Sequence, residues 1–117
     1  MQFSESLKKN HQFQFVFRNG KSYANKYLVM YVKENGLSKN HIGISVSKKV
    51  GNSVVRHRVT RLVRESYRLH ESIFNSGLDI VIVARPSAAF VGYHEIESAL
   101  LHLGKLHQII KVYFYME

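Results

Sequence analysis

The side chains that most often perform chemistry are present in this chain of 117 residues, but their spacing does not form a catalytic site. Among the seven histidines no two are four residues apart, the spacing that presents two ring nitrogens on one helix face to a metal. There is no cysteine, which excludes a thiol nucleophile and a thiolate zinc site. No Gly-x-Ser-x-Gly turn or phosphate-cradling glycine loop occurs either. We therefore expect no catalytic residue and no protein-held metal, and predict a binding function.

The strongest chemical signal is instead a basic segment, residues 45–68. Against one acid, Glu65, it carries seven cationic side chains: Lys48, Lys49, Arg56, Arg58, Arg61, Arg64 and Arg68. Over the whole chain, 17 Lys and Arg against 8 Asp and Glu give a formal net charge of +9. Such an excess on a small protein usually indicates a nucleic acid partner and less often an anionic membrane. A helix face of mixed sign is usually only solvated, so the nearly uniform sign here favours binding of a polyanion.

The elements that would position these side chains follow from the apolar periodicity. Residues 10–19 are predicted to form a helix that ends at Gly20 in a left-handed turn. Residues 23–33 and 41–47 are predicted to be strands, joined as an antiparallel hairpin through residues 35–39.

A long helix is predicted to begin at Asn52 or Ser53 and to end at Gly77, with the basic side chains opposite one apolar stripe. The stripe consists of Val55, Val59, Leu62, Val63, Leu69 and Ile73. Residues 78–84 form a nearly continuous apolar run, typical of a strand buried on both faces, and a last helix begins near residue 93. The apolar tail, residues 111–117, is expected to pack on the domain or on a neighbouring chain.

Length and composition bound the remaining possibilities. A chain of this length with 45% hydrophobic residues is expected to form a single domain, residues 1–117. It contains neither the N-terminal apolar run of a signal peptide nor a run of about 18 apolar residues. Together with the absence of cysteine, this predicts a soluble, cytoplasmic protein.

Three aromatic residues form a second signal. Phe13 and Phe17 are four residues apart on one face of the predicted first helix, and Tyr31 lies on the strand that follows. Aromatic rings on a sheet can stack on unpaired bases. They can also be ordinary core residues, which is the interpretation that periodicity alone favours.

The order of residues in the basic segment is specific to one family. Residues 42–58, Ile-Gly-Ile-Ser-Val-Ser-Lys-Lys-Val-Gly-Asn-Ser-Val-Val-Arg-His-Arg, followed by Arg61, Arg64, Glu65 and Arg68, closely resemble the signature of the protein subunit of bacterial ribonuclease P. The resemblance extends from residues 7–20 to residues 79–85 and is weakest in the C-terminal tail, which is more often basic in this family.

The resemblance implies an α+β fold: a single two-layer domain in the order helix, three strands, long helix, strand and helix. Its four-stranded sheet would contain a left-handed βαβ crossover, as in the second domain of a small-subunit ribosomal protein. General rules for crossovers predict the right-handed form, so the handedness is implied by the family alone.

The resemblance also implies a function, as the protein subunit of the ribonuclease P holoenzyme. This endoribonuclease hydrolyses one phosphodiester bond to remove the 5′ leader of precursor tRNA, which gives the mature tRNA 5′ end. The RNA subunit would carry the chemistry, with Mg²⁺ held mainly by that RNA and the substrate. The protein would bind the catalytic RNA and precursor tRNA, with no membrane or DNA partner. The alternatives are a ribosomal or RNA-assembly protein of the same fold and a stand-alone nuclease.

Site residues are implied position by position, in two groups. The leader-binding cleft would contain Phe13, Phe17 and Tyr31, between the sheet and the long helix, in place of the core role that periodicity favours. The residues that would contact the RNA subunit are Lys48, Lys49, Asn52, Arg56, His57, Arg58, Arg61, Arg64 and Arg68.

The chain departs from the signature at two positions. Where the family usually has asparagine between two arginines, this chain has His57, whose ring nitrogens can replace part of an amide contact. Where the family usually has lysine, the chain has Thr60, so one phosphate contact is expected to be missing.

Overall fold

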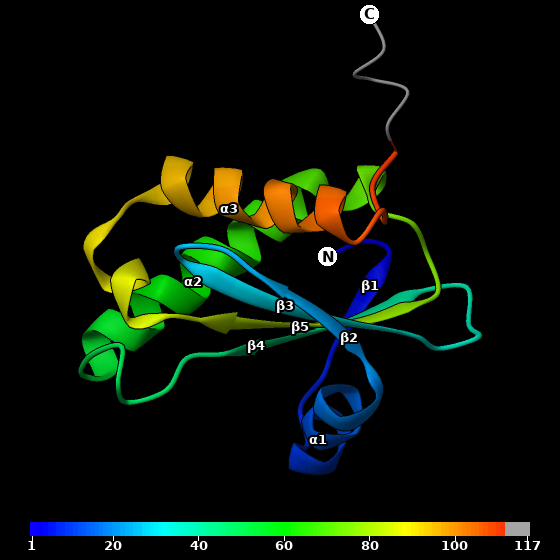
Figure 1. Ribbon diagram of the computed structural model, residues 1–117, viewed down its shortest axis with the longest axis horizontal. Coiled ribbons are helices and arrows are strands. Elements are labelled where there is room, and N and C mark those ends of the chain that lie inside the picture. Colours follow the sequence, from blue (N-terminus) through cyan, green and yellow to red (C-terminus); the bar gives the residue numbers. More distant parts are fainter. Residues whose placement is uncertain (112–117) are drawn as a thin grey trace, which may run out of the picture.

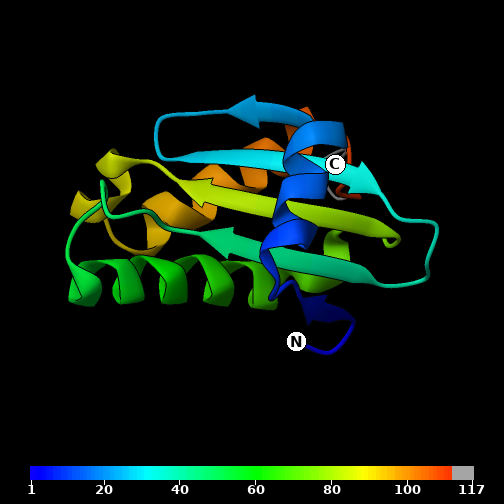
Figure 2. The ribbon, with the colours of Figure 1, turned by 90° about the horizontal axis from the view of Figure 1, so that it is seen from below.

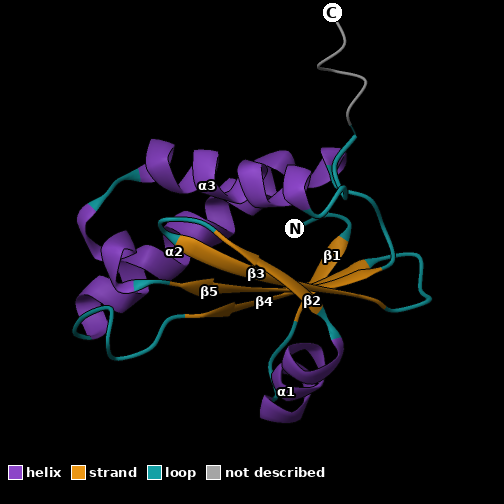
Figure 3. Ribbon diagram, viewed as in Figure 1, coloured by secondary structure: helices purple, strands orange, loops and turns teal. Residues whose placement is uncertain are grey.

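A mixed five-stranded sheet forms the centre of the computed structural model, which describes residues 1–111 (Figure 1). The elements in chain order are β1 (Ser4–Ser6), α1 (Asn10–Asn19), β2 (Lys21–Ala24), β3 (Leu28–Glu34), β4 (Asn40–Ser45), α2 (Ser53–His70), the 3₁₀ turn η1 (Glu71–Ile73), β5 (Leu78–Ala84), the 3₁₀ turn η2 (Pro86–Phe90) and α3 (Tyr93–Leu106). The strands lie in the order β1-β4-β5-β3-β2. Helices α2 and α3 cover one face of this sheet, and α1 lies on the other (Figures 1 and 3).

The connection from β4 through α2 to β5 is a βαβ crossover between parallel neighbours, with Ile42 opposite Ile80. Figure 2 looks onto the α1 face, and in this view α3 lies behind the sheet while α2, which Figure 1 shows on the same side as α3, runs along the β4 edge. In Figure 2 the parallel strands β4 and β5 both point to the left, and β5 lies above β4. Because the connecting helix lies on the far side of the sheet, this arrangement is a left-handed crossover. The expected α+β fold with this rare handedness is therefore confirmed.

The predicted hairpin between residues 23–33 and 41–47 is wrong, because β5 lies between β3 and β4. Strand β5 pairs antiparallel with β3 and parallel with β4. Its residues Ile80, Val81 and Ile82 are buried on both faces of the sheet, and such a strand is most stable at the sheet centre. The hairpin that forms joins β2 to β3, where Asn25 Oδ1 accepts the Leu28 N–H at 3.1 Å.

The sheet has one strand more than the four expected, because the short β1 pairs with the edge strand β4. Glu71 fixes this segment: its carboxylate accepts the backbone N–H groups of Gln2 at 3.0 Å and Phe3 at 2.9 Å. Burial raises the pKa of Glu71, but hydrogen bonds from Ser4, Phe3 and Gln2 outweigh it and hold the pKa below its usual value. The sequence Ser-Glu-Ser has no apolar alternation from which a strand could be predicted.

Helix α2 begins at a predicted cap and ends earlier than predicted. Asn52 Oδ1 accepts the backbone N–H of Val55 at 3.0 Å. The helix ends at His70 rather than Gly77, because the chain turns there and places the buried Phe74 against Tyr67, with 5.1 Å between ring centroids.

Two glycines therefore have roles other than the predicted ones. Gly77 provides a positive φ of 80° just before β5, a conformation that glycine adopts without strain. Gly20 has φ −85°, so the predicted left-handed end of α1 is wrong: the chain continues at once, extended, into β2.

The two faces of the sheet bury separate apolar clusters. The larger cluster lies between the sheet and helices α2 and α3, and Val59 and Val63 contribute to it as predicted. Leu69 of the predicted stripe is 54% exposed, while Tyr67, which the stripe does not include, is fully buried. The smaller cluster lies under α1 and has Leu7, Val16 and Val81 as its buried residues.

No helix within residues 1–111 combines the length and hydrophobicity that a membrane crossing requires. The predicted packing of the apolar tail concerns residues 112–117, which lie outside the described residues. At the start of that tail, the Lys111 N–H donates to the Ile73 carbonyl at 2.8 Å.

Candidate RNA interface

The outer side of α2 presents an exposed stripe of nitrogen-bearing side chains. His57, Arg61 and Arg64 are exposed and follow one another at four and three residues, the spacing that places them on one helix face. No acidic residue occurs between Asn40 and Arg64. The stripe can therefore approach a polyanion without meeting a negative charge of this segment.

Two lysines extend the cationic surface beyond the start of the helix. Lys48 and Lys49 are exposed in a turn in which the Val50 N–H donates to the Ser47 carbonyl at 3.0 Å. The guanidinium of Arg56 reaches back to this region, and its Nη1 donates to the Gly51 carbonyl at 3.1 Å. The turn and the first helical turns thus form one continuous basic surface.

Besides Arg56, two more of the predicted RNA-binding arginines have partners within the protein. Arg58 donates from Nη1 to the Val91 carbonyl at 3.1 Å and from Nη2 to the Ala89 carbonyl at 2.6 Å. Arg68 pairs with Glu65, with Nε to Oε2 at 3.0 Å, and this hydrogen bond lowers the pKa of the Glu65 carboxyl. The cationic side chains of residues 45–68 are therefore not equivalent.

Thr60 directs its hydroxyl to its own helix. Its Oγ1 donates to the Arg56 carbonyl at 2.9 Å. The expectation that a phosphate contact is missing here remains a prediction.

The predicted leader-binding aromatics come together under α1. The rings of Phe17 and Tyr31 meet edge to face, with centroids 4.9 Å apart and planes at 72°. Together with Phe13 they are partly buried and pack on the cluster under α1. Each ring thus has both a packed side and an exposed side.

The position of this aromatic group differs from the one expected. It lies between the sheet and α1, on the face opposite α2 and α3, and not between the sheet and the long helix (Figures 1 and 2). The alternation of β3 explains this: Leu28 and Met30 point into the large core, so Tyr31 points to the other face. The aromatic group and the basic face of α2 are therefore two separate surfaces.

Comparison with known proteins gives the family. The sequence model described as Ribonuclease P matches residues 1–107. The chain belongs to the ribonuclease P protein family. It is 70% identical over 107 residues to the ribonuclease P protein component of Lachnoclostridium phytofermentans, covering 92% of each chain. It is also 53% identical over 110 residues to that of Alkaliphilus metalliredigens, covering 94% of this chain and 99% of the relative.

Solved structures of the ribonuclease P protein family share the fold. The Staphylococcus aureus RNase P protein superimposes with a TM-score of 0.83 at 34% identity, covering 91% of this chain and 97% of that one. The crossover handedness and the position of α1 are thus family features rather than peculiarities of one sequence.

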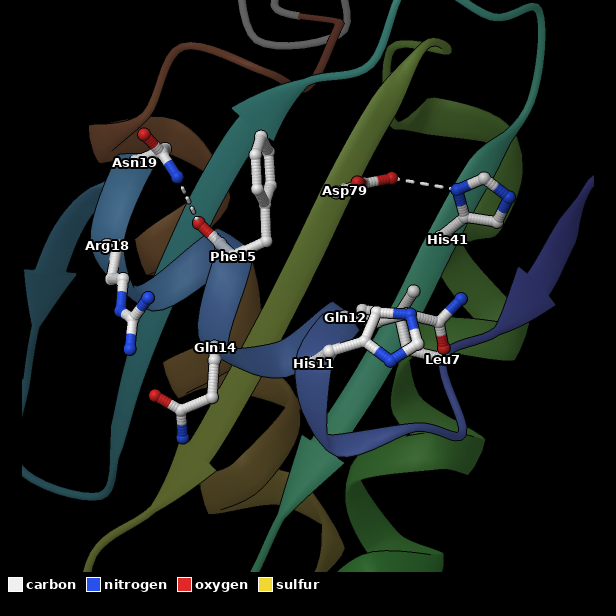
Figure 4. Close-up of a pocket in the computed structure, with 9 residues that line it drawn as sticks. All are labelled: Leu7, His11, Gln12, Gln14, Phe15, Arg18, Asn19, His41 and Asp79. Atoms are coloured by element: carbon white, nitrogen blue, oxygen red, sulfur yellow. Dashed lines mark hydrogen bonds and ion pairs between the residues drawn. The ribbon is translucent and has the colours of Figure 1, made fainter.

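Sequence reasoning missed a pocket of about 660 Å³ between α1 and the sheet, lined by both polar and apolar side chains (Figure 4). Its floor contains a pair from neighbouring strands: His41 Nδ1 donates to Asp79 Oδ1 at 2.8 Å. Asn35 Nδ2 donates to the same oxygen at 3.0 Å. The exposed Phe15 of α1 lines the pocket. No local pattern could reveal this pair, because parallel pairing of β4 and β5 brings together residues 38 positions apart.

Other histidines of this ribonuclease P family member connect elements of the fold. His70 Nε2 donates to Glu97 Oε2 at 2.8 Å, between α2 and α3, and lowers the pKa of that carboxyl. His107 donates to the Met30 carbonyl at 2.8 Å, and burial lowers its pKa. Within residues 1–111, no group of three or more histidine or acidic side chains is placed to hold a metal ion.

Proposed function

We propose that this chain is the protein subunit of ribonuclease P and binds the catalytic RNA through α2 and the turn before it. The observation that carries the proposal is the exposed stripe of His57, Arg61 and Arg64, continued by Lys48 and Lys49 without an intervening acid. Guanidinium groups match phosphate oxygens with two donors each, and lysines add point charges. The relatives named ribonuclease P protein component support the choice of RNA partner.

The aromatic group under α1 is proposed to bind the 5′ leader of precursor tRNA. Phe13, Phe17 and Tyr31 present partly exposed rings on a sheet face, a surface that suits stacking on unpaired bases. Mature tRNA lacks the leader and would not occupy this surface. The protein would in this way favour substrate over product.

The proposal assigns phosphodiester hydrolysis to the RNA subunit, with Mg²⁺ held mainly by that RNA and the substrate. The role of the protein is electrostatic and positional. Its cations would reduce repulsion between two polyanions, so that productive Mg²⁺ binding requires a lower Mg²⁺ concentration.

Reconstitution with a matching ribonuclease P RNA tests the proposal. At low Mg²⁺ the protein should accelerate removal of the leader from precursor tRNA compared with the RNA alone. No acceleration, with ribosomal RNA recovered instead in a pulldown, would favour an RNA-assembly protein of the same fold. Cleavage of precursor tRNA by the purified protein without RNA would assign the chemistry to the polypeptide.

A further inference from the structure

Phe90 is the most exposed large apolar side chain of residues 1–111, at 88%. It ends η2, the 3₁₀ turn between β5 and α3. The ring therefore contributes almost nothing to the core, although its immediate neighbours do. Ala88 is fully buried, and Ala89 and Val91 pack against the large cluster.

The backbone on both sides of Phe90 is fixed by one side chain. The carbonyls immediately before and after it, those of Ala89 and Val91, accept the two donors of Arg58 at 2.6 and 3.1 Å. A planar guanidinium makes such a two-point contact, which a single ammonium group cannot reproduce. The exposed ring thus projects from an anchored segment rather than from a loose loop.

The surroundings of Phe90 are cationic. Figures 1 and 2 both place residues 86–90 (yellow) beside the first turns of α2 (green), at the same end of the molecule as residues 46–52. Lys48, Lys49 and Arg56 belong to that end. Residues 40–64 and 80–94 contain no acidic side chain. The next acid in the chain, Glu95, accepts the Gly92 N–H at 3.0 Å, so the cations outnumber the acids at this end. A partner with both negative charge and an apolar face would match this surface.

RNA has both properties, because its phosphates carry the charge and each base has a π face. We propose that Phe90 is a stacking platform for an unpaired base of the RNA that α2 binds, and that Arg58 is the residue that positions it. This inference rests on the proposed function and adds an aromatic contact to a surface otherwise described by charge. Arg58 then acts on the RNA through Phe90.

The test measures affinity for a ribonuclease P RNA at several salt concentrations. Phe90→Ala should weaken binding by about 5- to 150-fold, the range of one base stack, without changing the slope of affinity against salt. Phe90→Tyr should retain the affinity. Phe3→Ala, an aromatic control that is 59% exposed next to β1 and beside Glu71 after the end of α2, should also retain it. Thermal denaturation of Phe90→Ala should match the parent, because the ring is outside the core.

The two proposals fail in different ways. Arg61→Ala removes an exposed cation and should weaken binding and reduce the salt slope by about one unit. If Arg61→Ala does so while Phe90→Ala binds like the parent, the stacking role is overturned and the proposed function stands. If neither variant changes binding, the proposal that α2 binds the RNA is overturned. Loss of binding to anionic phospholipid vesicles in Phe90→Ala, with RNA affinity unchanged, would assign the ring to a membrane instead.

The positioning role of Arg58 is tested by a double-mutant cycle. Arg58→Lys keeps the charge and loses the two-point contact, so Phe90→Ala should cost much less affinity in that background than alone. Additive losses would overturn the positioning role.

Discussion

The ring of Phe13 packs directly on Gly43 of β4. A Cβ at position 43 would lie 2.7 Å from Phe13 Cε2, closer than side chains tolerate, and 3.2 Å from Leu7 Cδ1, which is a tight contact. Gly43 pairs in register with Val81, so the ring lies over the middle of the sheet. The absence of a side chain at this one position therefore sets how deeply α1 sits on the sheet.

Gly43→Ala should displace the Phe13 ring and destabilise the protein by about 1–3 kcal/mol, the usual cost of overpacking. Urea unfolding measures this loss. Phe13→Leu provides the matched test: the double variant should be destabilised by less than the sum of the two single variants, because the smaller side chain makes room for the methyl group. An additive double variant would show that the ring does not pack on position 43.

Phe17→Ala and Tyr31→Ala should each weaken binding of precursor tRNA to the reconstituted holoenzyme by up to about 1–3 kcal/mol and leave mature tRNA binding nearly unchanged. The reason is that the edge-to-face pair fixes both rings at the proposed leader surface. Fluorescence titration of both tRNAs measures the difference. Equal losses for precursor and mature tRNA would assign the rings to the fold alone. Phe15→Ala is the control, since this exposed ring lies outside the aromatic group.

The parts of this molecule that follow from local sequence are those fixed by neighbouring residues. Asn52 could be predicted as a helix cap because its acceptor role involves only Val55, three positions away. The buried strand β5 could also be predicted, because its nearly continuous apolar run lies within neighbouring residues. Its place between β3 and β4 could not, because pairing order depends on where the chain returns after α2.

The candidate site divides in the same way. The basic segment can be read directly from the sequence, but the partners of Arg58 lie 31 and 33 positions further along the chain. Only the fold shows that this arginine binds two carbonyls and that Phe90 lies between them. The face occupied by Tyr31 likewise depended on which side of β3 the helices cover, a choice that alternation alone leaves open.

Acid should destabilise the protein partly through His107. Burial lowers its pKa, the nearby Lys21 adds to this effect, and the hydrogen bond to Met30 opposes it. The folded state therefore takes up this proton less readily than the unfolded chain, whose histidine titrates near the ordinary value of 6.5. Stability should fall as the pH drops from about 7 through 6.5 towards the lowered pKa of the folded state.

His107→Gln, which keeps a donor for the Met30 carbonyl, should lose less stability than the parent between pH 7 and 5.5 in urea unfolding. Glu71 and Glu97 do not interfere in this window: their pKa values lie below the ordinary 4.5, so their contribution to stability is lost only in stronger acid. Equal pH dependence in parent and variant would exclude His107 as the group responsible.

Thr60→Lys should strengthen RNA binding, because it adds a cation to α2 at the position where the family resemblance predicts lysine. If the new ammonium meets a phosphate, the slope of log affinity against log salt should steepen by about one unit. The free protein should lose about 0.2–0.5 kcal/mol per like-charge neighbour, since Arg56 and Arg64 are each four residues away. Thr60→Val is the control: it removes the hydroxyl that bonds to Arg56 without adding charge and should leave the salt slope unchanged. A Thr60→Lys protein with the parental slope would place position 60 outside the phosphate contacts.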